Sequence, residues 1–166
     1  MRNKKAKDMA LGGLMAALAV VIMSLGGLIP LATYVCCVLC MILCGVIHRF
    51  CGKRVAWTWY AAVSILALML GTDKEAAVLF VFIGYYPILK PAFDKYKVIG
   101  YVGKIVFFNV VILISYILLI YLFGMAAIIA EFTELGVVGG VVMLVLGNVT
   151  FLLFDRLLMI LNKKRG

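Results

Sequence analysis

Charged residues are scarce in this chain. Asp, Glu, Lys and Arg make up 14% of its 166 residues, whereas 67% of the residues are apolar. A soluble domain carries about 25% charged and about 45–50% apolar residues, because it needs polar side chains to cover its surface. The composition therefore excludes a soluble globular protein, a disordered chain and a secreted disulfide scaffold. It predicts that lipid is the main solvent.

Groups that carry catalysis are equally few. The chain has one His and only seven Asp plus Glu. His48 lies in a basic stretch, no expected span holds two deep carboxylates, and the HExxH, GxSxG and P-loop motifs do not occur. Pumps and proton-coupled antiporters need charges well inside the bilayer. We therefore expect no enzymatic activity, no cofactor and no metal.

Apolar segments separated by short charged joints predict an all-α, polytopic membrane protein: a single domain, 1–166, with six transmembrane helices. We expect Pro30 to end the first helix. Thr72 and Glu75 form a capping-box pattern at the start of the fourth helix, which Pro87 should kink and Pro91 should end. The expected helices span about 9–29, 31–47, 55–70, 73–89, 105–130 and 135–161.

The net charge of +9 fits either nucleic-acid binding or membrane topology. In the six-helix scheme, fifteen of the sixteen Lys and Arg residues lie on one side, including the joints 48–54 and 90–104, and Lys74 lies on the other. The positive-inside rule then places both termini in the cytoplasm, and we expect a multi-pass protein of the bacterial cytoplasmic membrane. The charge thus indicates orientation in the lipid bilayer and no nucleic-acid partner. The expected outer joints are acidic, with Asp73, Glu75, Glu131 and Glu134.

Small residues cluster near the start of the first expected helix. Gly12 and Ala16 are spaced by four, as are Gly13 and Ala17, and Ala10 precedes them. Small residues at this spacing let two helix backbones approach closely in lipid. The pattern therefore predicts either close packing within the chain or a docking face for another membrane protein.

Three of the five cysteines fall on one face of the second expected helix: Cys36, Cys40 and Cys44. Such a stripe has the chemistry to hold a soft metal such as Cu(I), but it lacks the Cys-x-x-Cys spacing of zinc and redox sites. Cys is also a small apolar residue that packs well. We expect packing, with no metal and no structural disulfide.

Three further features lie in or beside the expected spans. Asn148 is deep enough to need a partner, either another helix or a ligand, whereas Asp155 beside Arg156 should be solvated. The string Gly84–Pro91 predicts a helix exit or a hinge that a partner contacts. Aromatic residues at the inner interface predict anchoring or, alternatively, a ligand platform. These aromatic residues are Trp57, Trp59, Tyr60, Tyr85 and Tyr86.

The stretch Leu11-Gly12-Gly13-Leu14-Met15-Ala16-Ala17-Leu18-Ala19-Val20 resembles the first helix of the substrate-binding S components of energy-coupling factor transporters. The string from Gly84 to Lys90 is similar to that of small uncharacterised membrane proteins of Gram-positive bacteria. The first resemblance implies six helices, cytoplasmic termini and capture of a vitamin-like solute from outside. It also implies that the first helix docks, through Ala10, Gly13 and Ala17, to a shared transmembrane module driven by two ATPases.

Two functional hypotheses follow from the residues and this resemblance. The first is an S-component-like, solute-binding subunit of a transporter. Its candidate solute-binding residues, chosen for polarity and outer location, are Thr33, Tyr34, Ser64, Thr72, Asp73, Glu131 and Glu134, with Asn148 deeper in the bilayer. The second is a non-transporting membrane protein with an interaction, assembly or regulatory role. The cytoplasmic lysines and the hinge at Pro87 would then be its working face.

Overall fold

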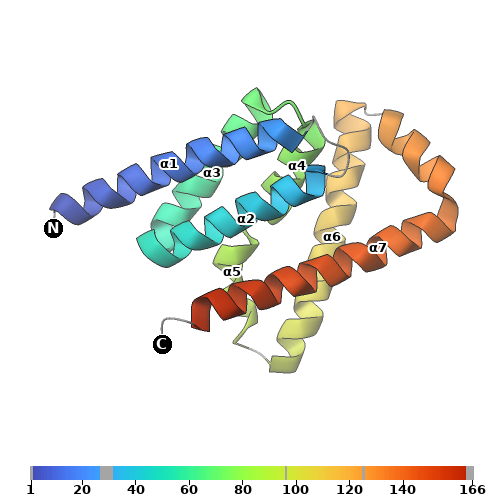
Figure 1. Ribbon diagram of the computed structural model, residues 1–166. Helices are drawn as coiled ribbons and strands as arrows, with labels where there is room; N and C mark the ends of the chain where they lie inside the picture. Colours follow the sequence, from blue (N-terminus) through green and yellow to red (C-terminus); the bar gives the residue numbers. More distant parts are fainter. Residues whose placement is uncertain (1, 27–31, 96, 125, 164–166) are drawn as a thin grey trace. The chain divides into compact units, whose positions relative to one another are not determined.

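The computed structural model describes residues 2–26, 32–95, 97–124 and 126–163, and every regular element in these ranges is a helix (Figure 1). The expectation of an all-α chain is confirmed for them. The expected helix end at Pro30 lies outside the described residues. The helices are α1 (Arg2–Gly26), α2 (Ala32–Cys51), α3 (Lys53–Leu70), α4 (Lys74–Ile83), α5 (Tyr86–Phe93), α6 (Lys97–Phe123) and α7 (Ala126–Lys163).

Five helical stretches among the described residues are long and apolar enough to cross a membrane. The α3 helix is not one of them, since Lys53 and Arg54 begin it and Trp57, Trp59 and Tyr60 follow. The structure thus agrees with the membrane-protein class that the composition predicts. The five stretches are Ala6–Gly26, Thr33–Cys51, Lys74–Phe93, Gly100–Tyr121 and Gly136–Ile160.

The chain divides into two compact units, Met1–Ala92 and Phe93–Gly166, which we call unit 1 and unit 2. In unit 1, α1, α2, α3 and α4 all contact one another. Small side chains dominate the interior of this unit, which allows the helices to pack closely. Its fully buried residues include Ala19, Met23, Cys40, Cys44, Val63, Ala67, Ala77 and Phe80. In unit 2, α6 packs against α7.

The cysteine stripe belongs to the interior of unit 1. Cys36, Cys37, Cys40 and Cys44 are buried free thiols, and Cys40 Sγ lies 3.5 Å from the Ala19 carbonyl oxygen of α1. These thiols therefore act as small core side chains where α2 meets α1.

The turn between α2 and α3 is much shorter than the basic joint 48–54 that we expected. His48 and Arg49 belong to the last turn of α2, and Lys53 already begins α3. Gly52 alone connects the helices with a φ of 89°. Glycine adopts this left-handed conformation without steric cost, so a single residue is enough to reverse the chain.

The fourth expected helix, 73–89, is two helices. Asp73 caps α4 by accepting a hydrogen bond from the Ala76 amide at 3.0 Å, so the expectation that Thr72 caps it is wrong. The chain breaks at Gly84, and Pro87 lies in the first turn of α5, where a missing N–H costs nothing. Pro91 does not end the helix, because α5 continues to Phe93. Proline removes only one intrahelical bond there.

Unit 2 also differs from the expected boundaries. The stretch 97–104, expected as part of a long joint, is helical and begins α6. Residues 131–134, expected as an acidic joint, are helical and belong to α7. The chain turns instead at Gly124, with a φ of 57°, and α7 kinks at Gly136. Glycine conformations rather than acidic side chains therefore set the turn and the kink.

Gly136 provides a direct test of the kink. Its φ of 62° and ψ of −175° lie in a region that is essentially restricted to glycine. We expect Gly136→Ala to lower the free energy of unfolding by about 1–3 kcal/mol. Gly140→Ala is the matched control, since an added Cβ meets nothing within 4 Å there and helix propensity favours Ala by up to about 1 kcal/mol. Thermal unfolding in detergent measures both changes, and equal effects would contradict the kink.

Candidate functional site

Polar side chains converge where α1 ends and where α2 and α4 begin. We call this region the acidic end of unit 1. The cluster draws on three helices and on the short segment before α4, so residues far apart in sequence meet there. It consists of Ser24, Thr33, Tyr34, Thr72, Asp73 and Glu75.

Asp73 is the centre of the acidic end. It is 9% exposed, and its two carboxylate oxygens accept hydrogen bonds from different helices. Thr33 Oγ1 of α2 donates to Oδ2 at 2.7 Å, and the Ala76 amide of α4 donates to Oδ1 at 3.0 Å. Gly26 of α1 is so near that a Cβ built on it would lie 3.0 Å from Oδ2. A buried carboxylate is tolerated because it is hydrogen-bonded in this way.

Three further contacts surround Asp73. Tyr34 Oη donates to Glu75 Oε1 at 3.2 Å in an exposed position. Thr72 Oγ1 donates to the Ser24 carbonyl at 2.7 Å, which ties the segment before α4 to α1. Lys74 Nζ donates to the Leu68 carbonyl at 2.8 Å. The lysine thus binds the last turn of α3.

The structure brings together four of the eight residues proposed for solute binding: Thr33, Tyr34, Thr72 and Asp73. Ser64 is buried in the middle of α3, about 10 Å along the helix from Gly71, and is not part of the cluster. Glu134 is exposed in α7 of unit 2, and Asn148 also belongs to unit 2. The side chain of Glu131 lies outside the described residues.

Glu75 was missing from the proposed solute-binding residues, although the sequence marks it as an acid of the same expected outer joint. It lies two residues after Asp73, and Tyr34 reaches it from α2. A pattern within one helix cannot reveal this contact, because the two residues are 41 positions apart.

The chemistry of the acidic end is that of a hydrogen-bond acceptor site. Each oxygen of Asp73 accepts one hydrogen bond, from the Thr33 hydroxyl or the Ala76 amide, and each has a second lone pair that is able to accept another. Tyr34 and Glu75 are more accessible and present a phenol and a carboxylate side by side. A small molecule with O–H or N–H groups has the complementary chemistry, because ionised carboxylates only accept hydrogen bonds.

The small residues of α1 divide between two faces. Trp59 Nε1 of α3 donates to the Gly12 carbonyl at 3.1 Å, and Gly12 and Ala16 are half-buried. The expected docking residues of the other face are exposed, namely Ala10, Gly13 and Ala17. The structure thus uses one part of the small-residue cluster for packing within unit 1 and leaves the other part accessible.

Asn148 bonds to the neighbouring helix in unit 2. The amides of Asn109 in α6 and Asn148 in α7 form two reciprocal hydrogen bonds of 3.0 and 3.1 Å. Each also donates to a carbonyl four residues earlier in its own helix, Ile105 or Leu144, at 2.8 Å. Of the two roles expected for Asn148, the structure shows the interhelical hydrogen bond.

An ion-pair network that includes a buried Lys104–Asp155 pair lies further along α6 and α7, beyond the two asparagines. Lys104 Nζ bonds to Asp155 Oδ2 at 2.9 Å and to Asp94 Oδ1 at 2.5 Å. The Asp155 side chain is 0% exposed, so the expectation that it is solvated is wrong. The physical reason is that Lys104 lies inside α6, not in a joint, and neutralises the carboxylate where the helices pack.

Two aromatic residues near the start of α3, Trp57 and Tyr60, pack with Tyr85, which lies two residues after the end of α4. Trp57 stacks on Tyr85 with ring centroids 6.0 Å apart, and Tyr60 meets both rings edge-on. Tyr60 Oη also donates to the Val81 carbonyl. These contacts show that the rings pack against one another, and the anchoring and ligand-platform roles both stay predictions.

Comparison of the chain with protein families, curated proteins and solved structures finds no match. The resemblance to S components therefore remains a prediction from sequence and layout. The geometry of this chain has to carry any functional argument.

Lys104 allows the unit 2 network to be tested. Removing one partner of a buried pair leaves an uncompensated charge, so we expect Lys104→Met to lower the free energy of unfolding by about 3–5 kcal/mol. Adding Asp155→Leu should recover most of this loss, because the buried charge is then gone. Thermal unfolding in detergent measures the effects. Exposed Lys95→Met is the control, expected within about 0.5 kcal/mol, and an equal loss there would contradict a structural role for the network.

Proposed function

We propose that this protein is a membrane-embedded, solute-binding subunit of a transporter, similar to an S component, that captures a small vitamin-like molecule from outside. The convergence of Thr33, Tyr34, Asp73 and Glu75 at one end of unit 1 carries the proposal. A chain with so few polar residues gathers four of them from two helices at a single place. The proposal assigns no enzymatic activity.

In this proposal the chain crosses the membrane six times, with α4 and α5 together forming one crossing. The α3 helix supplies the sixth. Its 18 residues extend about 27 Å, close to the hydrocarbon thickness of about 30 Å. It is joined to α2 by Gly52 alone and packs against α1 and α2, so a bilayer that surrounds those helices surrounds α3 as well.

The distribution of charge in unit 1 supports a cytoplasmic N-terminus. Within α1, Lys7 lies about 28 Å along the helix axis from Gly26, which is beside Asp73. Lys53 and Arg54 stand at the start of α3, and Glu75 stands at the start of α4. Basic residues are therefore in excess at one end of the helices, where Asp8 also lies, and acidic residues are in excess at the other, where Lys74 also lies. The positive-inside rule assigns the basic end to the cytoplasm.

The exposed face of α1 supports docking to a transmembrane coupling protein with ATPase subunits. Ala10, Gly13 and Ala17 are exposed, and an added Cβ at Gly13 meets nothing within 4 Å. Small residues allow another helix to approach closely in lipid. A non-transporting interaction, assembly or regulatory role would instead use the cytoplasmic lysines and the stretch around Pro87.

A thermal-shift screen of water-soluble vitamins tests solute binding. We expect one vitamin to raise Tm by about 5–10 °C at 100 times its Kd. Asp73→Asn should abolish most of this shift, because Asn keeps the helix cap but removes a carboxylate acceptor. Asp8→Asn, at the other end of α1, is the matched control and should retain the shift. If no vitamin stabilises the protein, the interaction or assembly role is favoured.

Replacement of Gly13 tests docking separately. Gly13→Leu leaves unit 1 undisturbed, since the position is open, but it blocks close approach of another helix. We expect recovery of ATPase subunits in pull-downs from bacterial membranes to fall at least about tenfold, which corresponds to about 1.4 kcal/mol. Gly140→Leu, at an equally open position of α7, should have no effect. Recovery of the ATPases with Gly13→Leu at the wild-type level would overturn the docking face.

A further inference from the structure

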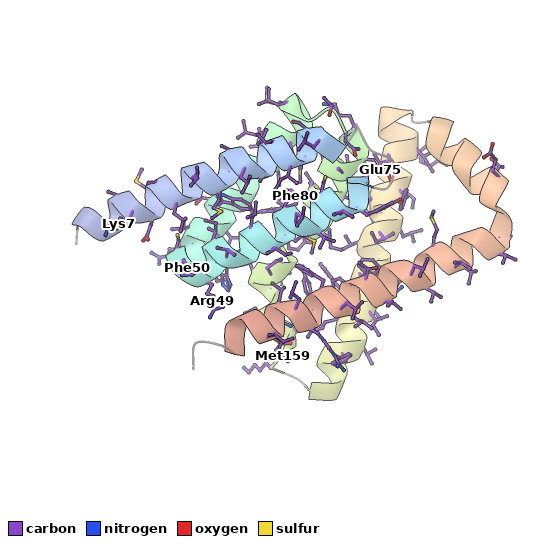
Figure 2. All side chains as sticks on the ribbon, viewed as in Figure 1. Lys7, Arg49, Phe50, Glu75, Phe80 and Met159 are labelled. Atoms are coloured by element: carbon purple, nitrogen blue, oxygen red, sulfur yellow. The ribbon has the colours of Figure 1, made fainter. Side chains whose placement is uncertain are left out.

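Basic side chains from three helices gather at the end of unit 1 opposite Asp73. We call this region the basic end: Lys7 of α1, Arg49 of α2, and Lys53 and Arg54 of α3. Cys51 Sγ lies 3.9 Å from the Asp8 carbonyl oxygen, which brings the start of α1 to the end of α2. Figure 2 shows Lys7, Arg49 and Phe50 at this end, away from Glu75.

The geometry of the basic end is fixed by the packing of the helices. Gly52 alone separates the end of α2, which carries Arg49 and Cys51, from Lys53 at the start of α3. The side chains of Lys7, Lys53 and Arg54 are exposed. Membrane orientation requires only an excess of Lys and Arg near the ends of the spans, and a flexible tail would satisfy it. Here the charges are held on a one-residue turn between two packed helices.

An exposed tryptophan lies directly beside these charges. Trp57 follows Lys53 by four residues and Arg54 by three, so all three share one face of α3. The Trp57 side chain is 37% exposed, and its ring is held against Tyr85 at 6.0 Å. Tryptophan prefers the level of the lipid headgroups, because its apolar ring contacts the acyl chains there while its N–H still meets water.

We propose that the basic end is a binding surface for the phosphate headgroup of anionic phospholipids. Arg54 and Lys53 supply the charge-assisted donors that a phosphate accepts, and Trp57 and the exposed Phe50 lie where the glycerol and upper acyl chain begin. The combination of fixed cations with exposed apolar rings matches a lipid better than a soluble anion or a nucleic acid. The surface is separate from the acidic end and does not depend on solute binding.

The test measures Tm of the purified full chain in detergent with added lipid. Dioleoylphosphatidylglycerol is compared with dioleoylphosphatidylcholine, which has the same acyl chains but no net charge, and with inorganic phosphate at the same concentration. We expect the anionic lipid to raise Tm by about 3–5 °C more than the zwitterionic lipid at ten times its Kd. Phosphate alone should give little or none of this difference.

Two matched double variants locate the effect. K53Q/R54Q removes two charges at the basic end and should lose most of the difference between the two lipids. K95Q/R156Q removes two exposed charges from unit 2 and should keep it. Each variant is compared with itself in the two lipids, so a change in its basal stability does not affect the result. Equal effects of both lipids, an equal loss in both variants, or a full shift with phosphate alone would each overturn the proposal.

Discussion

The carboxylate of Asp73 joins three helices of unit 1. It caps α4 through the Ala76 amide, accepts the Thr33 hydroxyl of α2, and lies against Gly26 of α1. In lipid, a polar group that finds no partner inside the protein costs several kcal/mol. The bonds to Asp73 therefore do more than close one end of the unit. They fix where three helices begin or end, and thereby bring Tyr34 and Glu75 within hydrogen-bond distance.

The same constraint organises unit 2 by different means. The reciprocal amide pair of Asn109 and Asn148 and the ion pair of Lys104 and Asp155 lie along the contact between α6 and α7. Both pairs are directional, whereas apolar side chains gain no hydrophobic driving force when they leave lipid to contact one another. A shift of either helix by one turn would leave these polar groups without partners. The register of the two helices thus depends on polar residues that the sequence contains in very small number.

Composition and local pattern predict the helical class of the chain and part of its polar cluster, whereas glycine geometry and tertiary contacts decide the features that they do not predict. High apolar content predicts membrane helices, and polarity selects Thr33, Tyr34, Thr72 and Asp73, which do cluster. The expected positions of the joints are wrong because charged residues do not by themselves end a helix. Lys104 continues α6, while Gly52 and Gly124 reverse the chain with positive φ. Asp155 next to Arg156 suggests solvation, but its partner Lys104 is 51 residues away and no local pattern reveals it.

The separation of charge along unit 1 connects these observations to function. Each of α1, α2 and α3 has its basic end on one side and its neutral or acidic end on the other, about one membrane thickness away. Under the positive-inside rule this charge distribution sets the proposed orientation of the unit. In that orientation Asp73 and Glu75 face the side on which an external solute arrives, while Lys53 and Arg54 face the leaflet in which anionic lipids attract basic residues. The proposed solute binding at the acidic end and the proposed lipid binding at the basic end then both follow from one charge distribution.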